Sequence, residues 1–173
     1  MIRTTWLLLL CLLGGAAHAE RPVVRSLLEM RQANLVMQQW DTSCAAAALA
    51  TVLTYHLRFP VSEEEVALGM LRHTDPLRVK FRGGFSLLDA KRYAADKGFA
   101  GDGYQQMTLD DLAERAPMIV PVTAWGYDHF VVVRRVSDAD VDIGDPGFGN
   151  YRMSRARFER TWPGIGFEVR RRE

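Results

Sequence analysis

An α+β domain is predicted from the order in which helix-like and strand-like patterns follow one another along this chain of 173 residues. Between residues 44 and 116, segments with helix-start and helix-stop signals follow one another. From residue 118 onward, short runs of β-branched residues alternate with turn residues, as in strands joined by hairpins. Helices that come first and neighbouring strands that come later favour helices packed on an antiparallel sheet.

The first 19 residues have the three parts of a secretory signal. Arg3 supplies the positive charge, residues 6–13 form an apolar stretch, and Ala17-His18-Ala19 is a small-x-small cleavage site. The apolar stretch is shorter than the roughly 20 residues that a membrane-spanning helix needs. We therefore expect an exported protein in which residues 1–19 are removed and residues 20–173 form one domain. An uncleaved anchor is the alternative.

The composition of the mature chain narrows its partners. Without Arg3 and Cys11, it has 21 basic and 21 acidic residues and a single cysteine, Cys44. Balanced charge argues against a nucleic-acid partner. One cysteine rules out an internal disulfide, and a lone thiol is a liability in an oxidising compartment. Cys44 is therefore either a small buried hydrophobe or a group that the protein uses.

Four helices are expected before the strands. The first begins near Cys44 and is stopped by Pro60. The second begins at a capping box, Ser62-Glu63-Glu64-Glu65. The third follows Gly83-Gly84, and the fourth is capped by Thr108 and closed by Pro117. In chain order, the four predicted helices cover residues 44–57, residues from 62 onward, residues 86–98 and residues 109–116.

The remaining elements are mostly strands. Residues 129–136 and 141–145 are predicted to form a hairpin around the turn at 137–140. A short helix capped by Ser154 is expected before the last strand. The predicted strands are 118–124, 129–136, 141–145 and 166–171, and the short helix is 154–162.

A thiol nucleophile needs a nearby base, and three histidines remain in the mature chain. His56 lies about three helical turns from Cys44, roughly 18 Å away, which is too far for a hydrogen bond. His73 is expected to be an exposed helix-end residue. His129 opens an apolar strand directly after a loop, where active-site residues often lie. His129 is therefore the candidate base.

Two further groups would complete such a site. Asp145 ends the strand that pairs with the His129 strand, although spacing leaves its approach to His129 undecided and turn initiation is its other role. Gln38 lies in the loop before Cys44 and is a candidate oxyanion donor, with Gln39 as the rival. Cys44 at a helix start would have its thiolate stabilised by the helix dipole. A metal site is not expected, because one cysteine with scattered histidines lacks the spacing of zinc ligands.

Together these residues resemble the C39 peptidases, which are papain-like double-glycine leader peptidases. The resemblance covers residues 34–169 and lies in the combination of motifs. They are Gln38 six residues before Cys44, His129-Phe130-Val131-Val132-Val133, Asp145-Pro146-Gly147-Phe148-Gly149 and Phe158-Glu159-Arg160-Thr161-Trp162-Pro163-Gly164.

The resemblance implies a papain-like α+β fold and a role for each motif residue. Cys44 would be the nucleophile, His129 the general base and then acid, Asp145 the orienting group, and Gln38 the oxyanion donor. No cofactor is implied. One departure is Ser43-Cys44-Ala45 in place of the family's usual Asp-Cys-Gly.

The substrate preference implied by the family is glycine before the scissile bond. Bulky side chains can restrict a cleft to glycine, and Trp125 and Tyr127 are candidate walls, with ordinary loop packing as their alternative role. The chain's own Gly83-Gly84 is interpreted as a lead into the third helix rather than a cleavage site.

Most relatives are domains of ABC exporters, whereas this chain has no ATP-binding motif and has its own signal. It therefore resembles the standalone exported members that accompany functional-amyloid (Fap) secretion in Gram-negative bacteria. That resemblance implies a periplasmic endopeptidase acting on a fibre subunit or another secreted polypeptide, with an outer-membrane pore as a further expected partner. Two alternatives stay open: an inactive substrate-binding module, and papain-like acyl transfer or amide hydrolysis on a small molecule.

Overall fold

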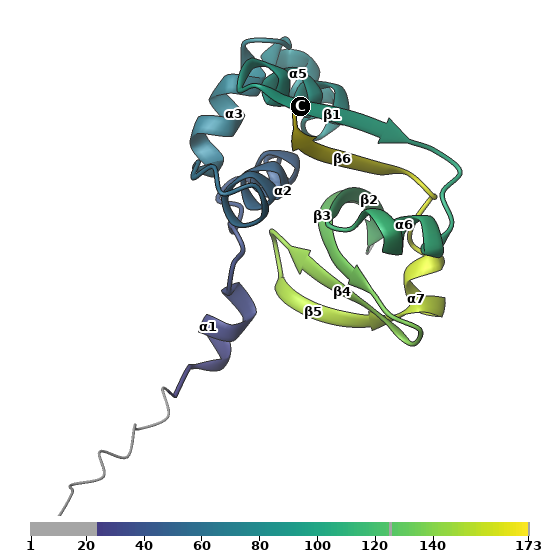
Figure 1. Ribbon diagram of the computed structural model, residues 1–173. Coiled ribbons are helices and arrows are strands. Elements are labelled where there is room, and N and C mark those ends of the chain that lie inside the picture. Colours follow the sequence, from purple (N-terminus) through teal and green to yellow (C-terminus); the bar gives the residue numbers. More distant parts are fainter. Residues whose placement is uncertain (1–23, 125, 173) are drawn as a thin grey trace, which may run out of the picture.

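The computed structural model describes residues 24–124 and 126–172, and it has the predicted α+β architecture (Figure 1). A bent antiparallel sheet has helices from residues 44–96 on one face and the two short helices 109–115 and 155–159 on the other face. The elements in order are α1 (Leu27–Gln32), α2 (Cys44–Thr51), η1 (Val52–His56), α3 (Glu63–Leu71), α4 (Pro76–Arg82), α5 (Leu87–Asp96), β1 (Phe99–Tyr104), α6 (Leu109–Arg115), β2 (Met118–Ala124), β3 (Tyr127–Val136), β4 (Asp140–Asp145), β5 (Gly149–Ser154), α7 (Arg155–Glu159) and β6 (Gly166–Arg171).

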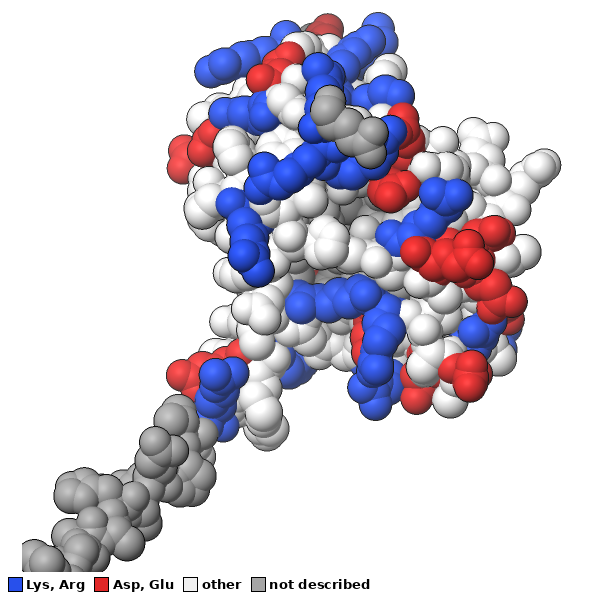
Figure 2. Space-filling model, viewed as in Figure 1, with Lys and Arg blue, Asp and Glu red and all other residues white. Residues whose placement is uncertain are grey.

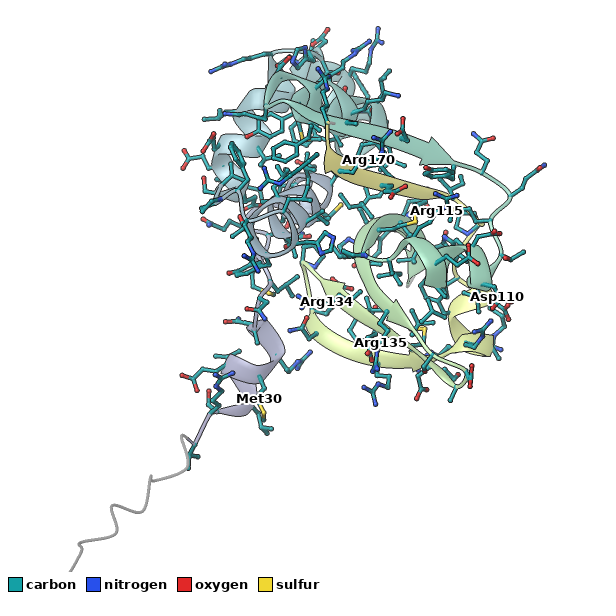
Figure 3. The ribbon with its side chains drawn as sticks, in the orientation of Figure 1. Met30, Asp110, Arg115, Arg134, Arg135 and Arg170 are labelled. Atoms are coloured by element: carbon teal, nitrogen blue, oxygen red, sulfur yellow. The ribbon has the colours of Figure 1, made fainter. Side chains whose placement is uncertain are left out.

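The sheet has six strands in the order β1-β6-β2-β3-β4-β5, and all neighbours are antiparallel. The strands β2 to β5 follow one another as hairpins, as the short turns between them require. The pairing of β3 with β4 shifts register between Val133 and Arg135. Arg134 and Arg135, both labelled in Figure 3, mark this irregularity next to β4. An extra residue of this kind bends a strand and re-aims the side chains beyond it.

The sheet buries apolar side chains on both faces. Ile119 of β2 and Val132 of β3 join the cluster formed by α2, α3 and α5. Their sequence neighbours point the other way, because side chains alternate along a strand. These neighbours belong to a second apolar cluster on the opposite face of the sheet, which includes Leu112 of α6 and Phe158 of α7. The two clusters hold the helices in place on either side of the strands that carry the candidate site.

The helix α2 is buried on every side. All eight of its residues are buried, and six of them are alanine or leucine, which are strong helix formers. A helix that is apolar all round belongs inside a protein. It continues into the π-helical segment η1, so that the helical run extends to His56, close to the predicted end at 57. Small alanine side chains let this helix approach β3 closely, which determines where Cys44 lies.

The helix starts were predicted well. The hydroxyls of Ser62, Ser86 and Thr108 each accept a hydrogen bond from a backbone N–H of the first turn. Ser154 does precede α7, but its side chain makes no capping hydrogen bond, and α7 ends at Glu159 rather than at the predicted residue 162. The prediction for α7 was therefore correct in place and wrong in length.

Four elements were not predicted: α1, α4, β1 and β5. The strand β1 has the sequence FAGDGY, whose glycines and aspartate are poor strand formers. It is a strand because it pairs along its whole length with β6. The helix α4 begins at Pro76 with Asp75 as its cap, in a segment for which no helix was predicted. Tertiary pairing and capping decided these segments.

The surface in view carries both signs of charge. Figure 2 shows Lys and Arg side chains interspersed with Asp and Glu, which agrees with the balanced composition. Among residues 24–124 and 126–172, no helix has the length and apolar character to cross a bilayer. The predicted signal at residues 1–19 lies outside the described residues.

Candidate active site

A pocket of about 510 Å³ lies where the start of α2 faces β3. It combines the predicted site residues with parts of the chain that are distant in sequence. Its lining residues are Gln38, Asp41, Cys44, Arg82, Gly83, Tyr127, Asp128, His129, Gly147 and Phe148. The structure thus brings four predicted positions, Gln38, Cys44, Tyr127 and His129, to one cavity.

Cys44 is the first residue of α2 and is a free thiol. Its side chain is mostly buried, with 8% of the residue exposed, yet it reaches the pocket and also a neighbouring cavity beside Pro121 and Phe130. The first N–H groups of a helix have no partner within the helix. The backbone N–H of Cys44 is therefore available to a group in the pocket, and the positive end of the helix dipole favours a negative sulfur.

His129 and Asp145 form a buried pair. The Nε2 atom of His129 lies 2.8 Å from Oδ1 of Asp145, and both residues are at most 4% exposed. The β3–β4 register explains the pairing. Val132 lies opposite Gly144, so that His129 and Asp145 are diagonal neighbours on the same face of the sheet. The register shift between Val133 and Arg135 moves the pairing by one residue and puts Asp145 on the same face as His129, two residues from the position directly opposite.

The pair raises the basicity of the imidazole. Burial alone would lower the pKa of His129, but hydrogen bonds and charge interactions with Asp145 and Cys44 outweigh it and raise the pKa to about 9. Because the Asp145 side chain occupies Nε2, the other ring nitrogen is left for the thiol. The arrangement favours an imidazolium beside Cys44 at neutral pH.

Asp145 is held by more than His129. Its Oδ1 also accepts hydrogen bonds from the backbone N–H groups of Gly147 at 2.8 Å and Phe148 at 3.1 Å. Its Oδ2 accepts one from the Tyr151 hydroxyl at 3.3 Å. Asp145 therefore initiates the turn and orients His129 at once, so the two roles considered from the sequence are compatible. Tyr151 was missed, because nothing in its local sequence links it to a residue six positions earlier.

Gln38 and Gln39 are separated by the structure. The side chain of Gln38 lines the pocket, and its Nε2 donates one hydrogen bond, to the Trp40 carbonyl at 3.3 Å. An amide nitrogen has two hydrogens, so one remains for a group in the pocket. Gln39 instead uses its backbone N–H to bond Glu63. Its residue is exposed and is not among those lining the pocket.

Gln38, His129 and Asp145 converge at Gly147. A Cβ added at Gly147 would lie 3.5 Å from Asp145 Oδ1 and 3.7 Å from both Gln38 Oε1 and His129 Cε1. The backbone of the same turn also anchors the Gln38 loop, because the Gln38 N–H donates to the Pro146 carbonyl at 2.9 Å. The turn after Asp145 therefore connects the base to the loop that precedes Cys44.

Two aromatic rings flank His129. The ring centroid of Tyr127 lies 5.9 Å from that of His129, and the ring centroid of Phe148 lies 6.5 Å from that of His129. Both residues are partly exposed and line the pocket. Tyr127 was predicted as a wall, and Phe148 was not. Trp125, the other predicted wall, lies outside the described residues.

The other histidines lie elsewhere. His56 is exposed at the end of η1, and His73 is partly buried with its Nε2 atom 2.5 Å from Asp96 Oδ2. Within the described ranges, no group of three or more His, Cys, Asp or Glu side chains is arranged to hold a metal. Gly83 ends α4 with a positive φ of 80° and lines the pocket, so the Gly83-Gly84 segment serves as a helix cap beside Cys44.

Comparison with known proteins places most of this chain in one family. The model described as the Peptidase C39 family matches residues 32–173. Among curated proteins, the probable functional amyloid protease FapD of Pseudomonas aeruginosa is 42% identical over 156 residues. That match covers 90% of this chain and 67% of the relative, so the chain spans about two thirds of the relative's length.

Solved structures agree with this match. The peptidase domain of Streptococcus ComA, a bi-functional ABC transporter involved in a quorum-sensing pathway, aligns with a TM-score of 0.67 at 26% identity, covering 80% of this chain and 98% of that one. A double glycine motif protease from an AMS/PCAT transporter, in complex with the leader peptide, aligns with a TM-score of 0.66 at 25% identity, covering 80% and 91%.

Proposed function

This chain belongs to the peptidase C39 family and is a cysteine peptidase, and we propose that it is a periplasmic endopeptidase that cleaves a secreted polypeptide after a glycine pair. The observation that carries the proposal is the buried His129–Asp145 pair in the pocket that Cys44 reaches. The same observation disfavours an inactive binding module, because nucleophile, base and orienting group are all present.

The proposed reaction uses the thiolate–imidazolium pair. His129 takes the proton of the Cys44 thiol, and the sulfur attacks the scissile carbonyl carbon. The C–N bond breaks as the imidazolium gives its proton to the departing amine, which leaves a thioester on Cys44. His129 then takes a proton from water, the hydroxide adds to the thioester, and Cys44 departs as the thiol. Asp145 keeps the imidazole oriented and stabilises its charged form.

The proposed oxyanion site has two donors. They are the backbone N–H of Cys44 and the second hydrogen of Gln38 Nε2. Donors fixed in advance stabilise the tetrahedral intermediate more than water does, because they need no reorganisation. Tyr127 and Phe148 border the same pocket, and we infer that they limit the residue before the scissile bond to glycine.

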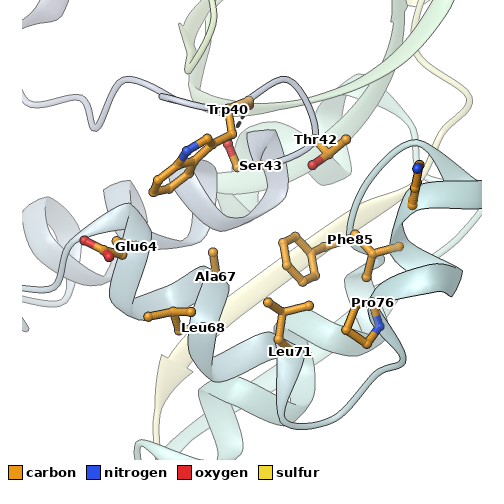
Figure 4. A pocket seen from close by; sticks show the side chains of 11 residues that line it. Trp40, Thr42, Ser43, Glu64, Ala67, Leu68, Leu71, Pro76 and Phe85 are labelled. Carbon is orange, nitrogen blue, oxygen red and sulfur yellow. Dashed lines mark hydrogen bonds between the residues drawn. The ribbon is translucent and has the colours of Figure 1, made fainter.

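The polypeptide substrate has a second region to contact. An apolar pocket of about 350 Å³ adjoins the loop that leads into Cys44, between Trp40, α3 and α4. Figure 4 shows Leu68, Leu71 and Phe85 lining it opposite Trp40. Apolar side chains of a substrate segment would be removed from water in this pocket. Each Å² of apolar surface buried in this way contributes roughly 25 cal/mol of favourable free energy. This pocket would give a polypeptide substrate a second contact region beside the loop that leads into Cys44.

The first experiment is labelling of the purified mature protein with a thiol-directed probe near neutral pH. We expect fast labelling of Cys44 that falls sharply in His129→Ala, because the imidazole no longer takes the thiol proton. His73→Ala is the matched control and should label like the wild type. Equally slow labelling of wild type and His129→Ala would contradict the proposed activation.

Biological context requires a second experiment. The likeness to a probable functional amyloid protease supports a role in amyloid secretion. We propose a fibre subunit or another secretion component as the substrate, and an outer-membrane pore as a partner. In cells carrying Cys44→Ala, the unprocessed substrate should accumulate, and N-terminal sequencing of the wild-type protein should begin at Glu20. Unchanged processing in Cys44→Ala would exclude this role.

A further inference from the structure

Glu63, the first residue of α3, is a buried carboxylate that the reaction does not use directly. Only 1% of it is exposed, although its neighbours Glu64 and Glu65 are exposed. We propose that Glu63 is a positioning residue, which holds the loop of residues 38–43 so that Gln38 and the Cys44 N–H face the oxyanion. The inference rests on the oxyanion role proposed above for these two groups.

The contacts of Glu63 all lead to this loop. Both carboxylate oxygens accept the backbone N–H of Gln39 at 3.0 Å, and Oε1 is also hydrogen-bonded to the Ser43 hydroxyl. Burying a carboxylate is costly unless it is well bonded. The start of α3 offsets part of that cost, because the helix dipole favours a negative charge there. The carboxylate therefore joins the two ends of the loop, one residue after Gln38 and one residue before Cys44.

A chain of hydrogen bonds continues from Glu63 to Gln38. The Ser43 hydroxyl lies between two acceptors, the Glu63 carboxylate and the Trp40 carbonyl, the latter at 2.7 Å in a contact drawn in Figure 4. Its single hydrogen is shared between them, so the backbone N–H of Ser43 is the second donor that holds the Trp40 carbonyl. The Trp40 carbonyl also accepts the Ser43 N–H at 3.2 Å and the Gln38 side-chain amide at 3.3 Å. The orientation of the Gln38 amide thus depends on a carbonyl that Ser43 holds, and Ser43 is held by Glu63.

A purely structural role and a positioning role make different predictions for Cys44. Alkylation of the thiolate by iodoacetamide forms no oxyanion, so it reports only on the Cys44–His129 pair. Acylation by 4-nitrophenyl acetate passes through a tetrahedral oxyanion, transfers the acetyl group to sulfur and releases nitrophenolate. Neither probe depends on the peptide that the enzyme cleaves, so the result stands apart from the proposed glycine specificity. The ratio of acylation rate to alkylation rate isolates the oxyanion site.

The test compares Glu63→Met, Glu63→Gln and Glu65→Gln. Met has a similar shape and accepts no strong hydrogen bond, so the loop loses its anchor. We expect the acylation-to-alkylation ratio of Glu63→Met to fall about 10- to 100-fold. The oxygen of Gln at this position can accept the Gln39 N–H and its amide can donate to Ser43, so most of the ratio should return. Glu65→Gln changes the same charge on an exposed residue of the same turn and should match the wild type.

Other results would overturn the proposal. They are an unchanged ratio in Glu63→Met, or acylation and alkylation falling together, which would mean that the whole site is disturbed. If Glu63→Met does not fold, Ser43→Ala removes the link between Glu63 and Trp40 and should lower the ratio several-fold. Gln38→Ala is measured in parallel. A ratio that falls in Glu63→Met and stays at the wild-type value in Gln38→Ala would reject the path through Gln38.

Discussion

The two halves of the active site are held by different forces. Cys44 is carried by α2, which makes no ladder hydrogen bonds and is fixed by apolar packing around every one of its residues. His129 and Asp145 are carried by the β3–β4 hairpin, where backbone pairing and one register shift determine which side chains meet. A packed core tolerates the exchange of one apolar side chain for another of similar volume, but it is destabilised by changes in side-chain volume. A strand tolerates changes in side-chain volume at its exposed positions. A one-residue change in its register, however, turns every side chain to the other face of the sheet.

The loop and turn between these halves connect them. The Gln38 N–H bonds the Pro146 carbonyl, and the Asp145 carboxylate accepts the N–H groups of the same turn. The nucleophile and the base therefore come from separate structural units that meet at one turn. Substitutions in the two halves should therefore have different effects. A change in α2 should mainly lower the stability of the protein, whereas a change in the β3–β4 hairpin should mainly disturb the orientation of His129 and lower activity.

The largest effect is expected in the hairpin half, from Asp145→Asn. Asparagine still accepts the turn N–H groups but no longer supplies the charge that raises the pKa of His129 to about 9. We expect kcat/KM to fall roughly 10²- to 10⁴-fold, as in related triads. The alkaline limb of its pH profile, near pH 9 in the wild type, should move to lower pH, because the imidazolium loses its proton earlier.

A control for this variant lies on the same strand. Asp142→Asn removes a carboxylate of β4 that bonds Arg135 and Arg152 at the surface. Its kcat/KM and pH profile should stay close to those of the wild type. A wild-type alkaline limb in Asp145→Asn would show that Asp145 does not tune His129.

An intermediate effect is expected in the helix half, from Ala48→Leu. Ala48 is fully buried in the cluster between α2 and the sheet, so a larger side chain overpacks it. The free energy of unfolding should fall by about 1–3 kcal/mol. Chemical denaturation measures it, with Ala113→Leu on the exposed side of α6 as the control. Full stability in Ala48→Leu would show that α2 is less tightly packed than its burial indicates.

The smallest effect is expected from Tyr151→Phe, which removes only the hydroxyl that donates to Asp145 Oδ2. The net worth of such a bond is about 1 kcal/mol, so kcat should fall several-fold with little change in KM. Steady-state kinetics on a glycine-pair peptide measure it. Tyr104→Phe removes a comparable hydroxyl that bonds Glu168, away from the pocket, and should leave kcat unchanged. Equal kinetics of the two variants would remove Tyr151 from the site.

The local sequence predicted what depends on local chemistry. The helix starts at Cys44, Ser62, Ser86 and Thr108 follow from capping and from helix-forming residues, and they were confirmed. The candidate residues Cys44 and His129 stood out because residues 20–173, which follow the predicted signal, contain one thiol and one histidine at a predicted strand start. Such signals are readable without a structure, because they act over a few residues.

Tertiary structure decided everything that depends on distant partners. The edge strand β1 exists through its pairing with β6, and Asp145 reaches His129 through a register shift that spacing did not reveal. The choice of Gln38 over Gln39 as the pocket residue, and the aromatic ring of Phe148 beside His129, depend on the turn after Asp145. Glu63 appeared in the sequence as part of a capping box, and only the packing of α3 against the loop placed its carboxylate under Ser43. Sequence periodicity determines which faces are buried, whereas the contacts between buried faces are determined by the whole fold.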